Sequence, residues 1–291
     1  MKKMLAAALA ALSLLGESAS AASVTLSGLA DSEDGMSYGV DARFSPTDSW
    51  AVGAGVGKNK SSVGGADFSG TSLRLSTDLS LGDFSAGASV QRWKDSNQLR
   101  STTVLGELGW MAANGLSLRA LLDDRNLTVQ YTTTVLGQPR ETHTDFKGTG
   151  IGADISWYGT HWNTGARFID YDYGRSVDRV RAALNSTSTT RFPGVPTLLD
   201  TIVTRTAGAP DQQLMATVGR KFSRASLHGD WAMQRDALTH TKVKSVSVTH
   251  GYEFGAKLRL DTTVGFSDSG ATDTVAFGGV ALTLRNQAAR D

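Results

Sequence analysis

The chain has no cysteine and only five prolines in 291 residues. Without cysteine there is no disulfide scaffold and no zinc or iron–sulfur site built on thiolates. The formal net charge is +1, which gives no basis for a nucleic-acid partner. The histidines form no HExxH pattern, and no GxGxxG or Walker pattern opens a helix. We therefore expect no cofactor, no metal site and no nucleic-acid binding.

Long apolar runs are also missing, with one short exception at the N-terminus. Two lysines precede the apolar stretch Leu5–Leu15, and the small residues Ala19-Ser20-Ala21 follow it. This order is typical of a secretory signal peptide cleaved after Ala21, and the stretch is too short to span a bilayer. We expect residues 1–21 to be removed, leaving 22–291 as a mature chain without a transmembrane helix.

The sequence is rich in glycine, with 32 residues, and apolar and polar residues alternate from end to end. In the segment 257–266, for example, Leu258 and Leu260 share one face of an extended strand, and Arg259 lies on the other. About fourteen segments show this alternation. They lie near 23–31, 36–44, 50–58, 69–80, 84–95, 98–110, 115–134, 146–158, 161–173, 210–222, 224–236, 241–254, 256–268 and 273–285.

These segments predict an all-β fold, a transmembrane antiparallel β-barrel of about fourteen strands, with twelve as the alternative count. Short connections such as 81–83 and 111–115 alternate with longer, more polar ones such as 32–36 and 58–68. With the N-terminus in the periplasm, the short turns are periplasmic, the longer loops lie outside, and an even strand count returns the C-terminus to the periplasm. The predicted location is the outer membrane of a Gram-negative bacterium, with membrane lipid and lipopolysaccharide as partners.

Aromatic residues gather at the strand ends beside the short turns. Amphipathic rings favour the headgroup level, so a membrane barrel is expected to carry such a girdle. A soluble β-sandwich, the alternative fold, would scatter its aromatic residues along the strands. The predicted membrane-interface girdle consists of Phe44, Trp50, Phe84, Trp110, Trp157, Trp162, Phe222 and Phe254.

Two segments resemble those of known outer-membrane proteins. The segment Ser23–Asp31, which follows the signal peptide, resembles the opening of Gram-negative porins of the β-proteobacterial type. The segment Phe277–Leu284 resembles the C-terminal signal read by the outer-membrane assembly machinery, although this chain continues to Asp291 instead of ending on an aromatic residue. The resemblance implies a porin-like outer-membrane β-barrel and the barrel-assembly machinery as a partner. It transfers no functional residue.

If the apolar faces meet lipid, the opposite faces line the barrel interior. Charged side chains there must be hydrated or paired, so the interior is either a water-filled pore or a lumen sealed by salt bridges. Fourteen strands make a wider barrel than the eight-stranded type that side chains fill, which favours the pore, and the mixed charges predict weak ion selectivity. The predicted pore-lining residues are Arg74, Asp78, Glu107, Arg119, Asp123, Asp154, Arg167, His228, Asp230, Lys257, Arg259 and Asp261.

Two stretches are less regular. The apolar positions of 115–134 change parity between Leu122 and Leu127, which predicts a β-bulge near 123–126 or two separate strands. The connection 174–210 is the longest and is expected to be an extracellular loop. It is expected either to fold into the lumen as a constriction or to form a solvated surface hairpin.

Three functions are consistent with this sequence. The favoured one is a passive, porin-like channel for small hydrophilic solutes. The alternative is a non-conducting barrel whose outer loops bind a partner, a surface or lipopolysaccharide. The third is a membrane-embedded hydrolase using Ser226, His228 and Asp230. Those three residues follow one another along one strand face at steps of about 6–7 Å, too far apart for a nucleophile and its base, so we predict no enzyme. The solute and the oligomeric state are not specified by the sequence.

Overall fold

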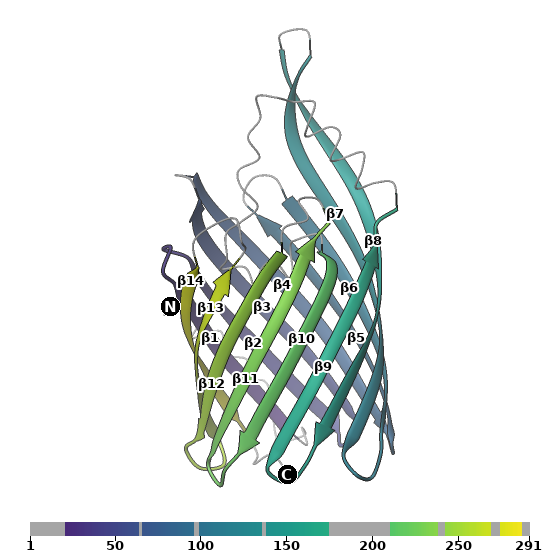
Figure 1. Cartoon of the computed structure of the whole chain (residues 1–291), viewed down its shortest axis with the longest axis vertical. Coiled ribbons are helices and arrows are strands. Elements are labelled where there is room, and N and C mark those ends of the chain that lie inside the picture. Colours follow the sequence, from purple (N-terminus) through teal and green to yellow (C-terminus); the bar gives the residue numbers. More distant parts are fainter. Residues whose placement is uncertain are drawn as a thin grey trace.

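The protein is a closed β-barrel of antiparallel strands (Figure 1). The computed structural model describes residues 21–63, 66–95, 99–135, 138–174, 210–237, 242–268 and 274–286. The predicted signal peptide up to residue 20 and the loop residues 175–209 lie outside this description. Within it, no helix has the length and the hydrophobicity needed to cross a bilayer.

Fourteen strands form the wall, which confirms the favoured count and excludes twelve. They are β1 (Ala21–Asp31), β2 (Met36–Thr47), β3 (Trp50–Val63), β4 (Ala66–Leu81), β5 (Phe84–Asp95), β6 (Leu99–Met111), β7 (Leu116–Val135), β8 (Gln138–Tyr158), β9 (Trp162–Asp172), β10 (Pro210–Lys221), β11 (Ala225–Asp236), β12 (Lys242–Glu253), β13 (Leu258–Asp268) and β14 (Val275–Arg285).

Each strand pairs with its sequence neighbours, and the first and last strands close the barrel. β1 pairs with β14 from Ser23↔Arg285 to Asp31↔Phe277. Closure pairs the edge strands, so the sheet has no open row of backbone groups, as a bilayer requires. The sequence alternation and the closed ladder thus define a transmembrane barrel.

The alternating faces of the strands differ sharply in chemistry. Outward positions expose large apolar side chains, such as Leu75, Leu108, Ile151 and Val264, which are 54–69% exposed. Inward positions carry Gly, Ser, Thr and many charged residues. An apolar outer band over a polar interior is the arrangement expected of outer-membrane barrels.

Short turns join the strands at one end of the barrel. Glycines with positive φ angles stand in three of them, Gly82 (62°), Gly115 (84°) and Gly255 (76°), where another residue would be strained. At the opposite end, β7 and β8 continue as a long hairpin above the neighbouring strands (Figure 1). The short turns and the long hairpin therefore lie on opposite sides of the membrane.

The structure corrects two details of the sequence interpretation. The predicted bulge near 123–126 is absent, and so is a break into two strands, because β7 pairs with β8 without a register shift from Leu116↔Trp157 to Val135↔Gln138. β8 also begins at Gln138, well before the predicted segment 146–158, and β3 and β4 extend over most of the predicted longer connection 58–68, since β3 ends at Val63 and β4 begins at Ala66. The β7–β8 hairpin is thus longer and more regular than its sequence suggests.

Candidate pore lining

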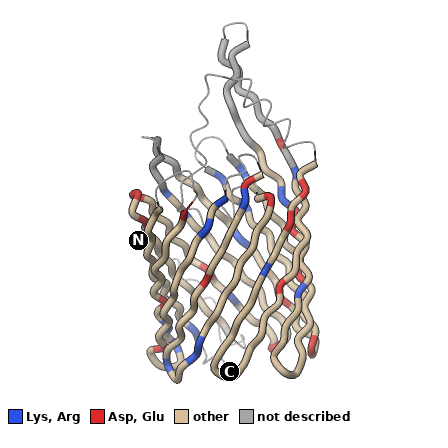
Figure 2. The backbone as a smooth tube through the Cα atoms, in the orientation of Figure 1, with Lys and Arg blue, Asp and Glu red and all other residues tan. Residues whose placement is uncertain are grey.

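The inner wall carries eleven of the twelve predicted pore-lining residues, at positions that alternate with the exposed apolar ones. Lys257 is the exception, because it lies in the short turn that precedes β13. Acidic and basic residues both occur among the inward residues, and Figure 2 shows blue and red segments interspersed along the strands of the barrel. The role of these residues in permeation remains a prediction.

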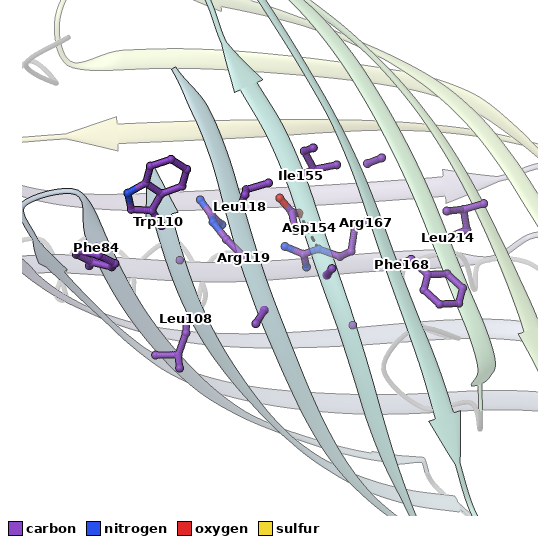
Figure 3. A pocket seen from close by; sticks show the side chains of 15 residues that line it. Phe84, Leu108, Trp110, Leu118, Arg119, Asp154, Ile155, Arg167, Phe168 and Leu214 are labelled. Atoms are coloured by element: carbon purple, nitrogen blue, oxygen red, sulfur yellow. Dashed lines mark hydrogen bonds and ion pairs between the residues drawn. The ribbon is translucent and has the colours of Figure 1, made fainter. Parts of the chain in front are cut away.

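One group of charged residues lies across β6 to β9. Arg167 on β9 donates from Nε to Asp154 Oδ2 on β8 at 3.1 Å, and Ser156 Oγ donates to Asp154 Oδ1 at 2.9 Å. On the other side, Arg119 on β7 approaches Glu107 on β6 at 3.7 Å. Figure 3 shows Arg119, Asp154 and Arg167 on three neighbouring strands. The charges form a belt along the wall.

A second group of pairs lies on β2–β4 and β12–β14. Arg43 and Asp78 meet at 3.0 Å across β3. Gly53 is the register partner of Arg43 on β3, and a Cβ atom there would stand 2.6 Å from Oγ of Ser76. Arg285 and Glu253 are 3.5 Å apart across β13, and Arg259 contacts Asp261 of its own strand at 2.7 Å. All ion pairs between two described residues join side chains on one strand or at most two strands apart.

An aromatic and charged cluster on β7 and β9 lies farther from the short turns. The Tyr171 hydroxyl donates to Asp123 Oδ2 at 2.7 Å, and Arg125 Nη2 donates to the same oxygen at 3.4 Å. The Arg125 guanidinium also stands 5.3 Å from the centre of the Tyr171 ring, within cation–π range. Burial raises the pKa of the Tyr173 hydroxyl, just beyond β9. We call Asp123, Arg125, Tyr171 and Tyr173 the wall cluster.

Glycines on β8 create the space for the two rings. A Cβ atom at Gly150 would stand 2.6 Å from Cε1 of Tyr171, and one at Gly148 would meet the Tyr173 ring even more closely. Tyr171 therefore crosses the bare backbone of β8 to reach Asp123 on β7, and the Tyr173 ring lies over Gly148. The rings stack on each other with centres 6.3 Å apart. Glycine at these positions is thus a packing requirement of the cluster.

Sequence reasoning identified Asp123 but missed the other members of this cluster. Leu121, Leu127 and Ile169 also face inward and are 1–4% exposed. Gln213 on β10 continues the network, because its Nε2 donates to Gln234 Oε1 on β11 at 3.3 Å. The sequence contained a signal for these tyrosines in the alternation of β8 and β9. Gly148 and Gly150 occupy inward positions of β8, and the tyrosines continue the inward positions of β9.

The arrangement on β11 does not favour a hydrolase. Ser226, His228 and Asp230 face inward in succession, as expected. Ser226 Oγ accepts a hydrogen bond from Arg259 Nη2 at 3.1 Å. In the part of the chain that the structure describes, no three His, Asp or Glu side chains are grouped so that they could hold a metal ion.

Six of the eight predicted girdle residues stand at outward positions at the ends of strands next to the short turns, and Phe222 and Phe254 follow directly after the last residues of β10 and β12. Most of their rings are well exposed, for example Trp50 (45%), Phe84 (63%) and Phe254 (54%). Arg220 packs against two of them, 5.0 Å from the Trp162 ring centre and 5.1 Å from that of Phe222. We expect these rings to lie at the headgroup level of the membrane.

A shallow depression with a volume of about 760 Å³ lies on the outward face over β5 to β10. Its floor includes the small side chains Ala120, Ala153 and Ala166. Larger residues such as Phe84 and Phe168 stand around it (Figure 3). The depression follows from this difference in side-chain length, and in a bilayer hydrocarbon fills it.

The closed ladder, the apolar outer band and the polar interior define an outer-membrane β-barrel of a Gram-negative bacterium. The sequence matches no protein-family model and no curated protein. Among solved structures, the fold is similar to "CymD monoaromatic hydrocarbon channel", with a TM-score of 0.52, 9% identity and coverage of 92% of this chain and 88% of that one. OmpT with loop L8 deleted, an outer membrane protein of Vibrio cholerae, matches with a TM-score of 0.48, 11% identity and coverage of 92% and 100%. OprB of Pseudomonas putida matches with 0.47, 8% identity and coverage of 95% and 96%.

Proposed function

We propose that this barrel is a passive, porin-like channel for small hydrophilic solutes. The observation that carries the proposal is the direction of the ion pairs. They run along the wall, between side chains at most two strands apart, and none of those between described residues crosses the lumen. A lumen sealed by salt bridges needs pairs between opposite walls. Charges held against the wall leave the centre available to water.

The size of the barrel supports the same function. Eight strands enclose an interior that side chains can fill, whereas fourteen enclose a wider one. Much of the inner wall is glycine, serine and threonine, as along β3 and β4, which keeps the polar lining thin. A wide, thinly lined and hydrated lumen transports solutes down their gradients according to size.

The pairing also predicts the selectivity. Acidic and basic side chains alternate on the inner wall, for example Asp154 between Arg119 and Arg167 in one register row. Neighbouring opposite charges cancel each other's field within about a Debye length, 8 Å at physiological salt. A permeating ion therefore meets little net field, and we expect cations and anions to permeate about equally.

Single-channel recording tests this function. The refolded chain, residues 22–291, is incorporated into a planar bilayer, and folding is checked by heat modifiability on gels. We expect discrete conductance steps and a reversal potential close to zero in a KCl gradient. Silence from folded protein would refute the channel.

The wall cluster favours a second candidate, a non-conducting barrel whose outer loops bind a partner or a surface. Tyr171, Tyr173 and Leu127 face inward but are only 1–7% exposed, so the barrel is tightly packed at this level. Deletion of residues 178–206, outside the described part of the chain, should then abolish binding while the barrel stays heat-modifiable. Binding that survives the deletion would argue against this candidate.

A further inference from the structure

A group of basic side chains stands on the outward face of β3, β5 and β6, at the ends far from the short turns. All of its members are exposed. We call this group the outer basic patch, and it consists of Lys58, Lys60, Arg92, Lys94 and Arg100. The predicted pore lining includes none of them, because they have the parity of the membrane-facing residues.

The strand register brings these residues together. Lys58 is the partner of Thr71 on β4, Thr71 is the partner of Lys94, and Lys94 is the partner of Arg100. Three cations thus stand in one row across four adjacent strands. Arg92 lies one outward position below Lys94 on the same strand, in register with Leu73. Neighbouring strands are about 4.8 Å apart, so the patch is compact.

The patch lies where the hydrocarbon region ends. β5 runs from Phe84, beside a short turn, up to Lys94. At about 3.3 Å per residue and a tilt of about 35–45°, these two residues stand about 23–27 Å apart along the barrel axis. The apolar band of outer-membrane barrels is about 25 Å tall. With the aromatic girdle at the periplasmic interface, the patch meets the headgroups of the outer leaflet.

Among the side chains that the structure describes, which do not include those of Asp67 and Asp95, no carboxylate forms an ion pair with any of the five. The exposed outward acids at a comparable distance from the short turns lie on other strands, namely Asp124 on β7, Asp145 on β8, Asp170 and Asp172 on β9 and Asp268 on β13. Lys147 on β8 is the exposed outward cation among those of β7–β9. Among the described side chains, the outer rim is therefore basic over β3, β5 and β6 and predominantly acidic over β7–β9. An anionic lipid is attracted to the first side and repelled by the second.

We propose that the outer basic patch binds the phosphate groups of lipopolysaccharide, which forms the outer leaflet of this membrane. Lys and Arg next to the headgroups supply charge-assisted hydrogen bonds to phosphate. Directly below them, Val56, Leu73 and Val90 are 44–51% exposed and provide an apolar surface for the acyl chains. The site thus matches both halves of the lipid. Its occupation does not depend on whether the lumen conducts.

Two double variants test the proposal. K94Q/R100Q removes two neighbouring cations from the row, and R224Q/K257Q removes two exposed cations in the short turns, beyond the girdle, as a control of equal charge. The protein is placed in phosphatidylcholine nanodiscs with increasing fractions of dansyl-labelled lipopolysaccharide, and energy transfer from tryptophan reports binding. Each basic side chain next to an anionic lipid surface contributes about fivefold, so K94Q/R100Q should lower the affinity about thirtyfold, and the control should leave it unchanged.

Two further lipid probes identify the ligand chemistry. Lipopolysaccharide treated with phosphatase to remove its phosphate groups should bind the unaltered protein as weakly as intact lipopolysaccharide binds K94Q/R100Q. Labelled phosphatidylglycerol should bind more weakly than lipopolysaccharide. Equal losses in both double variants, or no effect of phosphatase, would overturn the site. Equal binding of phosphatidylglycerol, with equal sensitivity to K94Q/R100Q, would overturn its assignment to lipopolysaccharide.

Discussion

Replacing Gly150 with alanine should destabilise the barrel far more than this small change suggests. The added Cβ would stand 2.6 Å from Cε1 and 2.7 Å from Cδ1 of Tyr171, and 2.9 Å from Cγ2 of Ile169. These distances are too short for carbon atoms, so the Tyr171 ring must leave the wall. Its hydroxyl then loses the 2.7 Å hydrogen bond to Asp123, and the ring loses its contact with Arg125.

The expected magnitude combines three contributions. Overpacking of this kind costs about 1–3 kcal/mol. A hydrogen bond to a charged group contributes about 1.5–3 kcal/mol, most of which is lost when the ring moves. Alanine instead of glycine in a strand opposes this loss by about 0.5–1 kcal/mol. We expect the free energy of unfolding to fall by about 2–5 kcal/mol in total.

The assay is guanidinium unfolding of the folded barrel in lipid vesicles, followed by tryptophan fluorescence. The matched control is Gly106→Ala, because a Cβ at Gly106 would meet nothing closer than 3.9 Å. A double-mutant cycle with Tyr171→Ala isolates the cause, since most of the clash disappears with the ring. If G150A is as stable as G106A, or loses as much stability in the Y171A background, the reasoning about the wall cluster is wrong.

Two other predictions concern the inner wall and the girdle. The triple variant E107Q/D154N/D230N neutralises three inward acids and leaves the charges of Arg119 and Arg167 uncompensated. The channel should therefore become anion-selective. The measurement is the shift of the reversal potential in a KCl gradient. An unshifted potential would show that these side chains do not face the permeation path. Brominated lipids should quench the fluorescence of a variant that retains Trp110 as its single tryptophan, but not that of a variant that retains only Trp93. Trp93 is 4% exposed, faces inward and donates a hydrogen bond to Asn59 Oδ1. Equal quenching of the two would contradict the assignment of faces.

The strand count and the faces could be predicted because both follow from contact with lipid. Where a strand crosses hydrocarbon, outward residues must be apolar and inward ones need not be, which produces a visible alternation. β9 and β13 show this clearly, and their predicted bounds differ from the observed ones by at most two residues. Beyond the hydrocarbon the constraint ends. The first residues of β8, Gln-Pro-Arg-Glu-Thr-His, are polar on both faces, so nothing in their pattern distinguishes a strand from a loop.

The same physics explains the incorrect bulge in β7. We expected a register shift to keep Leu127 on the lipid side, but the strand continues regularly and Leu127 faces inward, only 1% exposed. The outward positions around it are held by Asp124 and Asn126, both exposed, because the strand has already left the hydrocarbon. At this height a leucine is more favourably buried against the inner wall than left outside among polar headgroups. The change of parity in the sequence therefore marks the membrane boundary, and its position on β7 agrees with the height at which the outer basic patch begins on β5.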